Sequence, residues 1–142
     1  MLVDDLMSTD VVTVPARASI RGTVGRMLST GADAVVVVDS EGNPGGLVTR
    51  DDIVHVVYQA DKPPEEIRVV AVAHAPALTL SPSITVRKAV RRMCAENVRV
   101  ALVVDGLDVE GIVRARDVLD HLSVLLQQAT DARDDSSGGP TA

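Results

Sequence analysis

The sequence is nearly devoid of aromatic residues: among its 142 residues there is no tryptophan, no phenylalanine and a single tyrosine, Tyr58. Apolar residues nevertheless make up 46% of the chain, and most of them are valine, alanine, leucine and isoleucine. Small and β-branched side chains suit closely apposed strands and helices. We therefore expect a tightly packed aliphatic core. The scarcity of aromatic rings also leaves little surface on which a base could stack.

Cysteine is also scarce, because Cys94 is the only one. A single cysteine cannot form an intramolecular disulfide and has no second thiol with which to bind a metal ion. In the helical pattern Cys94 takes the position that Leu28 has in an earlier helix, so we expect a small buried side chain.

Basic residues are outnumbered, with 14 Lys and Arg against 20 Asp and Glu, a net charge of −6 and a pI near 4.9. Nucleic acids require a basic surface for their phosphates. The charge balance therefore argues against a nucleic-acid partner, and a locally basic patch would have to overcome the overall field.

Long hydrophobic runs and a basic leader are missing as well. No uninterrupted apolar stretch approaches the ~18–20 residues of a membrane span, and the first five residues, Met-Leu-Val-Asp-Asp, do not resemble the start of a signal peptide. We expect a soluble, cytoplasmic protein without a membrane partner.

What the sequence does contain is an internal repeat. Two copies of one pattern are offset by 66 residues from Met27 to Met93 and by 65 residues from Gly46 to Gly111, which places a one-residue deletion in a turn of the second copy. Two such half-units bury one face against each other, so any functional site is expected where they meet.

The hydrophobic pattern predicts a β-α-β-β-α order in each copy. In the first copy we expect a strand at 11–14 closed by Pro15, a helix capped by Ser19 with apolar positions Ile20, Val24, Met27 and Leu28, strands at 34–39 and 47–48, and a helix at 51–60. In the second copy the same elements are expected at 77–80, 85–95, 100–105, 109–113 and 115–128.

These elements predict one core built from two half-units. The predicted divisions are a first repeat at 3–60, a linker at 61–68, a second repeat at 69–129 and a disordered tail at 130–142. The tail has nothing to bury, although a partner-binding segment is the alternative.

Several short motifs, each present twice, resemble a cystathionine-β-synthase (CBS) domain. They are Asp5-Leu6-Met7-Ser8 before Val11–Val14, then Ala34–Asp39 and Gly46–Ile53 in the first copy, and Leu78–Leu80, Ala101–Asp105 and Gly111–Val118 in the second. The chain thus resembles a tandem CBS pair, also called a Bateman-type module, over roughly residues 3–122.

The resemblance implies an α+β fold of two β-α-β-β-α repeats packed with pseudo-twofold symmetry. It implies two clefts between the repeats, which in many family members bind AMP, ADP, ATP or S-adenosylmethionine as a regulatory ligand. It also implies a homodimer that acts on another protein, here an unknown effector, and no required cofactor.

Thr49, Asp51 and Asp52 are the strongest site residues in the first copy. In the family the Thr and the Asp three residues later face the nucleotide, and a carboxylate offers two acceptor oxygens to the ribose hydroxyls. The same Thr-x-x-Asp spacing also forms a helix capping box, in which Thr49 and Asp52 satisfy backbone N–H groups. Both interpretations remain open at this stage.

The second copy differs, because Arg114 and Arg116 stand in place of Thr49 and Asp51 while Asp117 keeps the position of Asp52. Arg114 has no hydroxyl and cannot cap a helix, but its planar guanidinium can bind a phosphate. We therefore expect two chemically unequal clefts.

By family resemblance each cleft also takes residues from the opposite copy. The Asp52 cleft is expected to include Leu78, Val98, Arg99 and Val100, and the Asp117 cleft is expected to include Met7, Val12, Ala32, Asp33 and Ala34. Adenine would then lie between aliphatic side chains and bond to strand backbone.

These positions bring opposite charges together. Arg99 should meet Asp51 and Asp52, and Asp33 should meet Arg114 and Arg116. The arginines could hold phosphates, or the charged groups could pair with one another and close the clefts, at about 0–1 kcal/mol for each surface pair.

Catalysis has little support in the sequence. His55, His74 and His121 are far apart, and none is expected beside a nucleophile or a metal partner. The predicted function is a non-enzymatic sensor of an adenine-containing ligand, with no catalytic or metal-binding residues. The alternative is a dimeric scaffold whose clefts stay empty.

Overall fold

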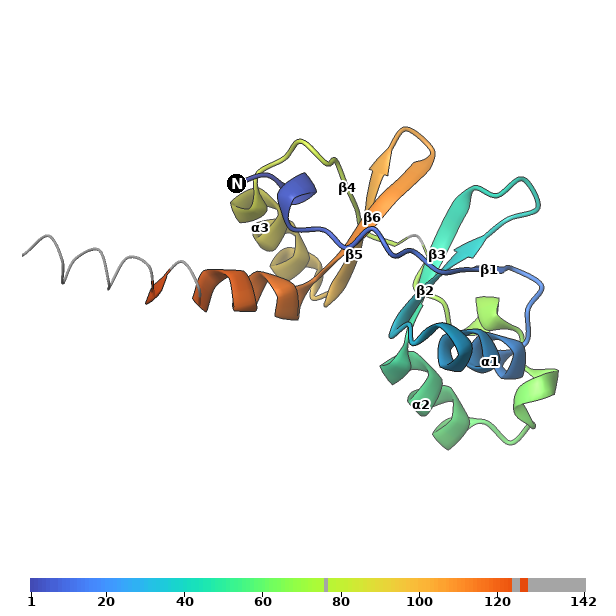
Figure 1. Cartoon of the computed structure of the whole chain (residues 1–142). Coiled ribbons are helices and arrows are strands. Elements are labelled where there is room, and N and C mark those ends of the chain that lie inside the picture. Colours follow the sequence, from blue (N-terminus) through green and yellow to red (C-terminus); the bar gives the residue numbers. More distant parts are fainter. Residues whose placement is uncertain (76, 124–125, 128–142) are drawn as a thin grey trace, which may run out of the picture.

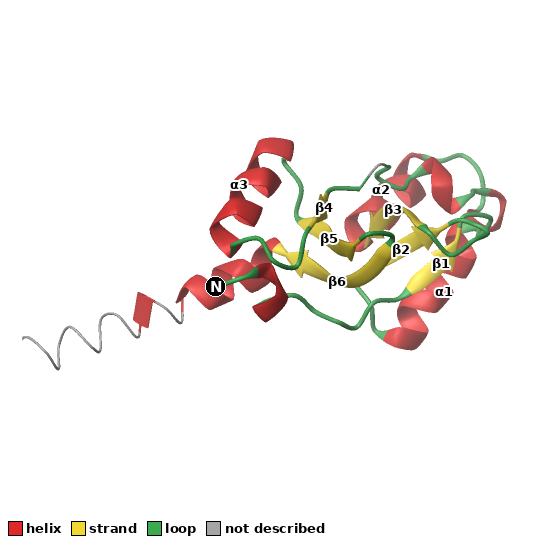
Figure 2. Cartoon of the chain, turned by 90° about the horizontal axis from the view of Figure 1, so that it is seen from above, coloured by secondary structure: helices red, strands yellow, loops and turns green. Residues whose placement is uncertain are grey.

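Two three-stranded sheets with the same topology form the centre of the structure (Figures 1 and 2). The computed structural model describes residues 1–75, 77–123 and 126–127. In this part of the chain no helix is both long and apolar enough to cross a membrane. The expected disordered tail and the end of the last expected helix, from residue 128 onward, lie outside the described residues.

The observed elements follow the predicted order. The first copy contains β1 (Thr13–Pro15), α1 (Ile20–Thr30), β2 (Ala34–Val38), β3 (Pro44–Thr49) and α2 (Arg50–Gln59). The second contains β4 (Thr79–Leu80), α3 (Val86–Glu96), β5 (Val100–Asp105), β6 (Asp108–Arg114) and a helix over residues 115–123. Short 3-10 turns form η1 (Val3–Asp5), η2 (Pro64–Glu66) and η3 (Val69–Ala71).

Within each sheet the first strand is parallel to the second, and the second is antiparallel to the third. The strand expected at 11–14 is shifted to Thr13–Pro15; it ends at Pro15, as expected, but includes the proline as its last residue. Pro15 pairs with Val38, which β1 tolerates because it is an edge strand and the missing N–H leaves no central ladder bond unmade. The shorter hairpin turn lies between β5 and β6, where Asp105 pairs with Asp108.

Helix α1 begins at the expected cap, Ser19, whereas α3 begins one residue later than expected because Thr85 is its cap. Ser19 Oγ accepts a hydrogen bond from the N–H of Gly22 at 3.0 Å, and Thr85 Oγ1 accepts one from the N–H of Lys88 at 3.2 Å. A side-chain acceptor at this position satisfies one of the free N–H groups of the first turn.

The prediction that Cys94 is buried is wrong. Cys94 is exposed, and its counterpart Leu28 is 80% exposed. The buried stripes run through Ile20, Thr23 and Met27 in α1 and through Val86, Ala89 and Met93 in α3. The next residue along a helix lies about 100° further around its axis, which turns Leu28 and Cys94 away from the sheets.

The two sheets face each other across a small apolar cluster. Val36 and Leu47 from the first sheet pack with Leu102 and Ile112 from the second, and all four are at most 4% exposed. Val36 and Leu102 are equivalent in the two copies, as are Leu47 and Ile112. The expected sheet-to-sheet packing with pseudo-twofold symmetry is therefore confirmed.

The lead-in segment of each copy packs on the other copy. Val3 is fully buried in the core of the second copy, and its N–H donates to the carbonyl of Ile84 at 2.9 Å. Val69 is fully buried in the core of the first copy, and its N–H donates to the carbonyl of Ala18 at 2.8 Å. Figure 1 shows the N-terminal segment beside α3 before the chain crosses to β1.

Two glycines allow these crossings. A Cβ on Gly111 would lie 2.6 Å from the carbonyl oxygen of Ser8, and a Cβ on Gly46 would lie 3.2 Å from that of His74. At both places the crossing segment bonds to the strand, since Ser8 pairs with Ile112 and His74 pairs with Leu47. A side chain at Gly111 would push the first lead-in off the second sheet, whereas a methyl group at Gly46 would require the second lead-in to shift by a few tenths of an ångström.

We expect Gly111→Ala to lower the free energy of unfolding by about 1–3 kcal/mol, because the new methyl group collides with backbone that cannot rotate away. Urea denaturation is the measurement. Gly45→Ala is the matched control, since a Cβ there meets nothing closer than 3.9 Å. Equal stability of the two variants would contradict the proposed close packing.

Candidate functional site

A cleft of about 460 Å³ opens between the two copies beside the start of α2. Its lining includes all seven residues predicted for the Asp52 cleft: Thr49, Asp51, Asp52, Leu78, Val98, Arg99 and Val100. The first three come from the first copy and the other four from the second. This volume is within the usual range for small-molecule sites.

Thr49 and Asp52 form the capping box that was one of the two interpretations of this motif. The backbone N–H of Thr49 donates to Asp52 Oδ2 at 2.7 Å, and the N–H of Asp52 donates to Thr49 Oγ1 at 3.4 Å. The Thr49 hydroxyl also donates to Asp52 Oδ2 at 3.0 Å. One carboxylate oxygen of Asp52, Oδ2, is therefore used to cap the N-terminus of α2.

The other oxygen of Asp52 faces the cleft and contacts His74. Nε2 of His74 lies 2.7 Å from Oδ1 of Asp52, whose side chain is 15% exposed against 66% for His74. The imidazole N–H donates in this bond, because an ionised carboxylate only accepts. This contact between His74 and Asp52 was not anticipated from the sequence.

His74 was not predicted from the sequence as a cleft residue, although its place in the second lead-in pointed to the cleft. It lies in the second lead-in, and the crossing of that segment onto β3 brings its backbone against Leu47. Its counterpart in the first lead-in, 66 residues earlier, is Ser8.

The mouth of the cleft has opposite charges on its two sides. Arg99 lies 3.5 Å from Asp51, with side chains that are 87% and 75% exposed. The expected Arg99–Asp51 contact is therefore confirmed, whereas Asp52 pairs with His74 instead of with Arg99. An exposed pair of this kind contributes about 0–1 kcal/mol, so a ligand phosphate can replace Asp51 as the partner of Arg99 at little cost.

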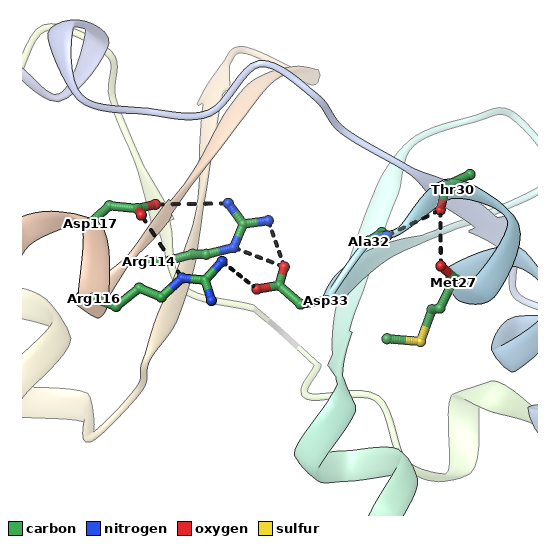
Figure 3. A network of polar contacts seen from close by, with 7 residues as sticks. All are labelled: Met27, Thr30, Ala32, Asp33, Arg114, Arg116 and Asp117. Atoms are coloured by element: carbon green, nitrogen blue, oxygen red, sulfur yellow. Dashed lines mark hydrogen bonds and ion pairs between the residues drawn. The ribbon is translucent and has the colours of Figure 1, made fainter.

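The second predicted cleft is bridged by ion pairs (Figure 3). Arg114 donates from Nε to Asp33 Oδ1 at 2.9 Å, and its terminal nitrogens lie 2.7 Å from Asp33 and 3.8 Å from Asp117. Arg116 lies 3.0 Å from the other oxygen of Asp33 and 4.0 Å from Asp117. The expected contacts of Asp33 with both arginines are confirmed.

This network joins the two copies, because Asp33 precedes β2 while Arg114 ends β6. The side chain of Arg114 is only 13% exposed and that of Asp33 only 25%, so solvent screens this pair less than the Arg99–Asp51 pair. Burial by itself raises the pKa of Asp33, but the hydrogen bond and charge of Arg114, with the charge of Arg116, place the pKa of Asp33 below its ordinary value of 3.8.

The remaining residues predicted for the Asp117 cleft are distributed more widely. A cavity of about 370 Å³ is lined by Asp33, Arg114 and Arg116, but Met7, Val12, Ala32, Ala34 and Asp117 are not among its lining residues. Met7 packs against the core of the second copy, and Val12 against that of the first. Ala34 is buried between the sheets, and the N–H of Ala32 donates to Thr30 at the end of α1 (Figure 3).

In the part of the chain that the structure describes, no three His, Cys, Asp or Glu side chains gather closely enough to hold a metal ion. His55 lies on α2 three residues after Asp52, and His121 lies on the helix at 115–123.

Comparison with known proteins identifies the family. The CBS domain family model matches residues 3–59 and 69–124, so the chain belongs to the CBS domain family and contains two CBS domains. Structures of this family have the same architecture as the one described above.

Among relatives, an uncharacterized protein of Methanocaldococcus jannaschii is 28% identical over 89% of this chain and 33% of its own length. An uncharacterized protein of Methanopyrus kandleri is 27% identical over 82% of this chain and 60% of its own length. The chain thus spans about one third and three fifths of the lengths of these two relatives.

Solved structures show the same fold. A CBS domain protein from Pyrobaculum aerophilum complexed with AMP superposes with a TM-score of 0.78 at 22% identity, covering 92% of this chain and 99% of that one. The CBS domain pair of protein MJ0100 in complex with 5′-methylthioadenosine and S-adenosylmethionine gives 0.76 at 22% identity, covering 87% and 96%. A hexameric CBS-CP12 protein from bloom-forming cyanobacteria gives 0.78 at 24% identity, covering 97% and 85%.

We expect Asp33→Asn to lower the free energy of unfolding by roughly 1–3 kcal/mol at pH 7, because Arg114 loses its charged acceptor. The pKa of Asp33 is lower in the folded than in the unfolded chain. Its stabilising contribution is therefore present at neutral pH and is lost as the pH falls through the folded-state pKa, below about pH 4. Urea denaturation between neutral and acidic pH measures both effects.

The acid dependence of stability should be weaker in Asp33→Asn than in the unmodified protein. Asp10→Asn, which removes one exposed carboxylate outside the network, is the matched control. If the two variants lost stability equally on acidification, the assigned role of the Asp33–Arg114 pair would be incorrect.

Proposed function

We propose that this chain is a regulatory module that binds an adenine-containing ligand in the Asp52 cleft and acts on a partner protein without catalysing a reaction. The observation that carries the proposal is the convergence of seven predicted residues from both copies on one cleft of about 460 Å³. A ligand bound there touches both halves of the module, so its binding free energy depends on how the halves are arranged.

The cleft offers distinct surroundings for each part of such a ligand. The aliphatic side chains of Leu78, Val98 and Val100 provide an apolar slot for adenine, which needs no aromatic residue. Asp52 Oδ1 becomes the acceptor for ribose hydroxyls when the exposed His74, which contacts it at 2.7 Å, turns away. Thr49, held against Asp52, positions the carboxylate.

Phosphates would extend toward the arginines. The neighbouring cavity of about 370 Å³ shares Thr49, Asp51, Arg99 and Val100 with the Asp52 cleft, and it adds Arg50, Arg114 and Arg116. Arg99 is the first cation that a phosphate on the ribose meets, and its pairing with Asp51 is weak enough to be exchanged.

The two clefts are unequal in this proposal. Arg114 is already bound by Asp33 and is largely buried, and Asp117 lies within the same network. A nucleotide in the second cleft would have to separate this buried pair, which leaves charges without partners. The Asp52 cleft is therefore the preferred site.

Related structures support an adenine ligand. Proteins with this fold have been solved with AMP in one case and with 5′-methylthioadenosine and S-adenosylmethionine in another. Both are 22% identical to this chain, so they support the class of ligand and leave its identity to experiment.

A second candidate function is a scaffold with empty clefts. It is favoured by the occupation of both Asp52 oxygens, one by Thr49 and one by His74, and by the ion pairs that bridge the second cleft. In that case the charged residues would serve only to hold the two copies together.

We also propose that the module forms a homodimer through the helices that end the two copies. Exposed apolar residues occupy equivalent positions on them: Val54 (66%) and Val57 (54%) on α2 match Leu119 (65%) and Leu122 (43%) on the helix at 115–123. Tyr58, 88% exposed, extends the α2 surface. Such a repeated apolar surface suits a symmetric self-contact.

Ligand binding is tested by calorimetry and thermal unfolding with adenosine, AMP, ATP and S-adenosylmethionine. A ligand at 100 times its Kd should stabilise the fold by about 2.7 kcal/mol. Arg99→Ala should weaken AMP and ATP binding roughly tenfold or more, because a charged hydrogen bond is lost, and should leave adenosine binding unchanged. Arg21→Ala, an equal change of charge on α1, is the control and should bind all ligands normally.

If none of these ligands bound at millimolar concentration, the scaffold would be the better description. If Arg99→Ala weakened adenosine binding as much as ATP binding, the placement of the phosphates beside Arg99 would be wrong. The assignment of the Asp52 cleft as the ligand site would remain.

The dimer is tested by light scattering after size-exclusion chromatography. Leu119→Glu should shift the protein to monomer, because a carboxylate in an apolar interface must be desolvated. Leu107→Glu, on the β5–β6 turn and similarly exposed at 68% against 65%, should leave the oligomeric state unchanged. A Leu119→Glu protein of unaltered mass would place the interface elsewhere.

A further inference from the structure

Helix α3 carries four exposed cations on its outer face. Arg87, Lys88, Arg91 and Arg92 occupy two adjacent turns and, with Thr85 and Ala95, line a shallow hollow of about 510 Å³. The opposite face of the helix buries Val86, Ala89 and Met93 against the second sheet. We call the four exposed residues the basic face of α3.

None of these four side chains has an ion-pair or hydrogen-bond partner among the residues that the structure describes. The six ion-pair contacts found there involve Arg99, Arg114, Arg116 and His74 as the positive groups. Glu96, the acidic residue of α3, lies at the far end of the helix and lines the Asp52 cleft. Within the described residues the basic face is therefore left unneutralised.

This arrangement is unfavourable for the isolated helix. Arg87 lies four residues before Arg91, and Lys88 lies four residues before Arg92, so both pairs place like charges on neighbouring turns, which destabilises a helix. Arg87 and Lys88 also sit in the first turn, which has no acidic residue, at the end where the helix dipole disfavours cations.

The first copy shows that the fold does not require these charges. At the equivalent positions α1 has Arg21, Gly22, Gly25 and Arg26, so two of the four cations are absent from the same place in the same architecture. α3 and α1 lie at opposite ends of the molecule (Figures 1 and 2). Locally unfavourable residues that the fold does not need are typical of a functional surface.

We propose that the basic face of α3 docks a short acidic segment of a partner protein. Carboxylates bound along the helix would reduce the repulsion between the like charges and the unfavourable interaction of Arg87 and Lys88 with the helix dipole. The 11 residues of α3 span about 16 Å, which matches roughly five residues of extended chain. The proposal does not depend on nucleotide binding.

A protein segment fits this surface better than a nucleic acid does. The whole chain carries a net charge of −6, so the part outside these four cations carries −10 and repels a polyanion longer than the patch. The lining of the hollow also contains no aromatic ring against which a base could stack. A short acidic segment meets only the local positive charge.

The test uses a fluorescently labelled peptide of about ten glutamates and measures anisotropy at about 50 mM salt, where screening is modest. Arg91→Gln/Arg92→Gln should weaken peptide binding at least tenfold. The matched control, Arg21→Gln/Arg26→Gln, makes the same change of charge on the exposed face of α1 and should bind the peptide as the unmodified protein does. Both variants replace exposed side chains, and thermal unfolding checks that they are folded.

If the two variants weakened peptide binding equally, binding would be due to the overall electrostatic field and the proposal would be overturned. Absence of peptide binding to the unmodified protein would overturn it as well. Tighter binding of a single-stranded DNA or of anionic phospholipid vesicles than of the peptide would also overturn it. Calorimetry with ATP on the same two variants reports on the Asp52 cleft separately, so failure of either proposal leaves the other testable.

Discussion

The exchange of lead-in segments between the two copies is the constraint on which the rest of the structure depends. Val3 completes the core of the second copy and Val69 completes the core of the first, and both are fully buried. Neither copy could bury its apolar face without the other's segment. The same crossings require a glycine at 111, approach Gly46 closely, and carry His74 to the edge of the Asp52 cleft.

Symmetry in the backbone coexists with asymmetry in the polar groups. In one cleft Asp52 caps a helix through Thr49 and contacts an exposed histidine. In the other Arg114 is held by Asp33 in a largely buried ion pair that bridges the copies. Exposed pairs are weak and exchangeable, whereas separating a buried pair leaves desolvated charges. This difference in burial, more than the difference in residue type, makes the Asp52 cleft the more accessible one.

Much of the fold and of the candidate site could be predicted, because the internal repeat provides two independent copies of each pattern. The central strands and the cap at Ser19 follow from residue type and spacing, and the Arg99–Asp51 and Asp33–Arg114 contacts follow from the resemblance to the CBS family. Cys94 and Leu28 were misplaced because a helical pattern identifies an apolar stripe but not its edge. His74 was overlooked because the predicted elements did not include the crossing of its segment onto β3.

By itself the sequence determined the β-α-β-β-α order, the family and the unequal chemistry of the two clefts, because these depend on residue types and on spacing along the chain. Only the tertiary structure decided which acceptor each charged group obtains. Asp52 could cap a helix or face a ligand, and its two oxygens are divided between Thr49 and His74. Hydrogen bonds of this kind depend on distances of a few ångströms between segments far apart in the chain, and such distances exist only after the two copies have packed together.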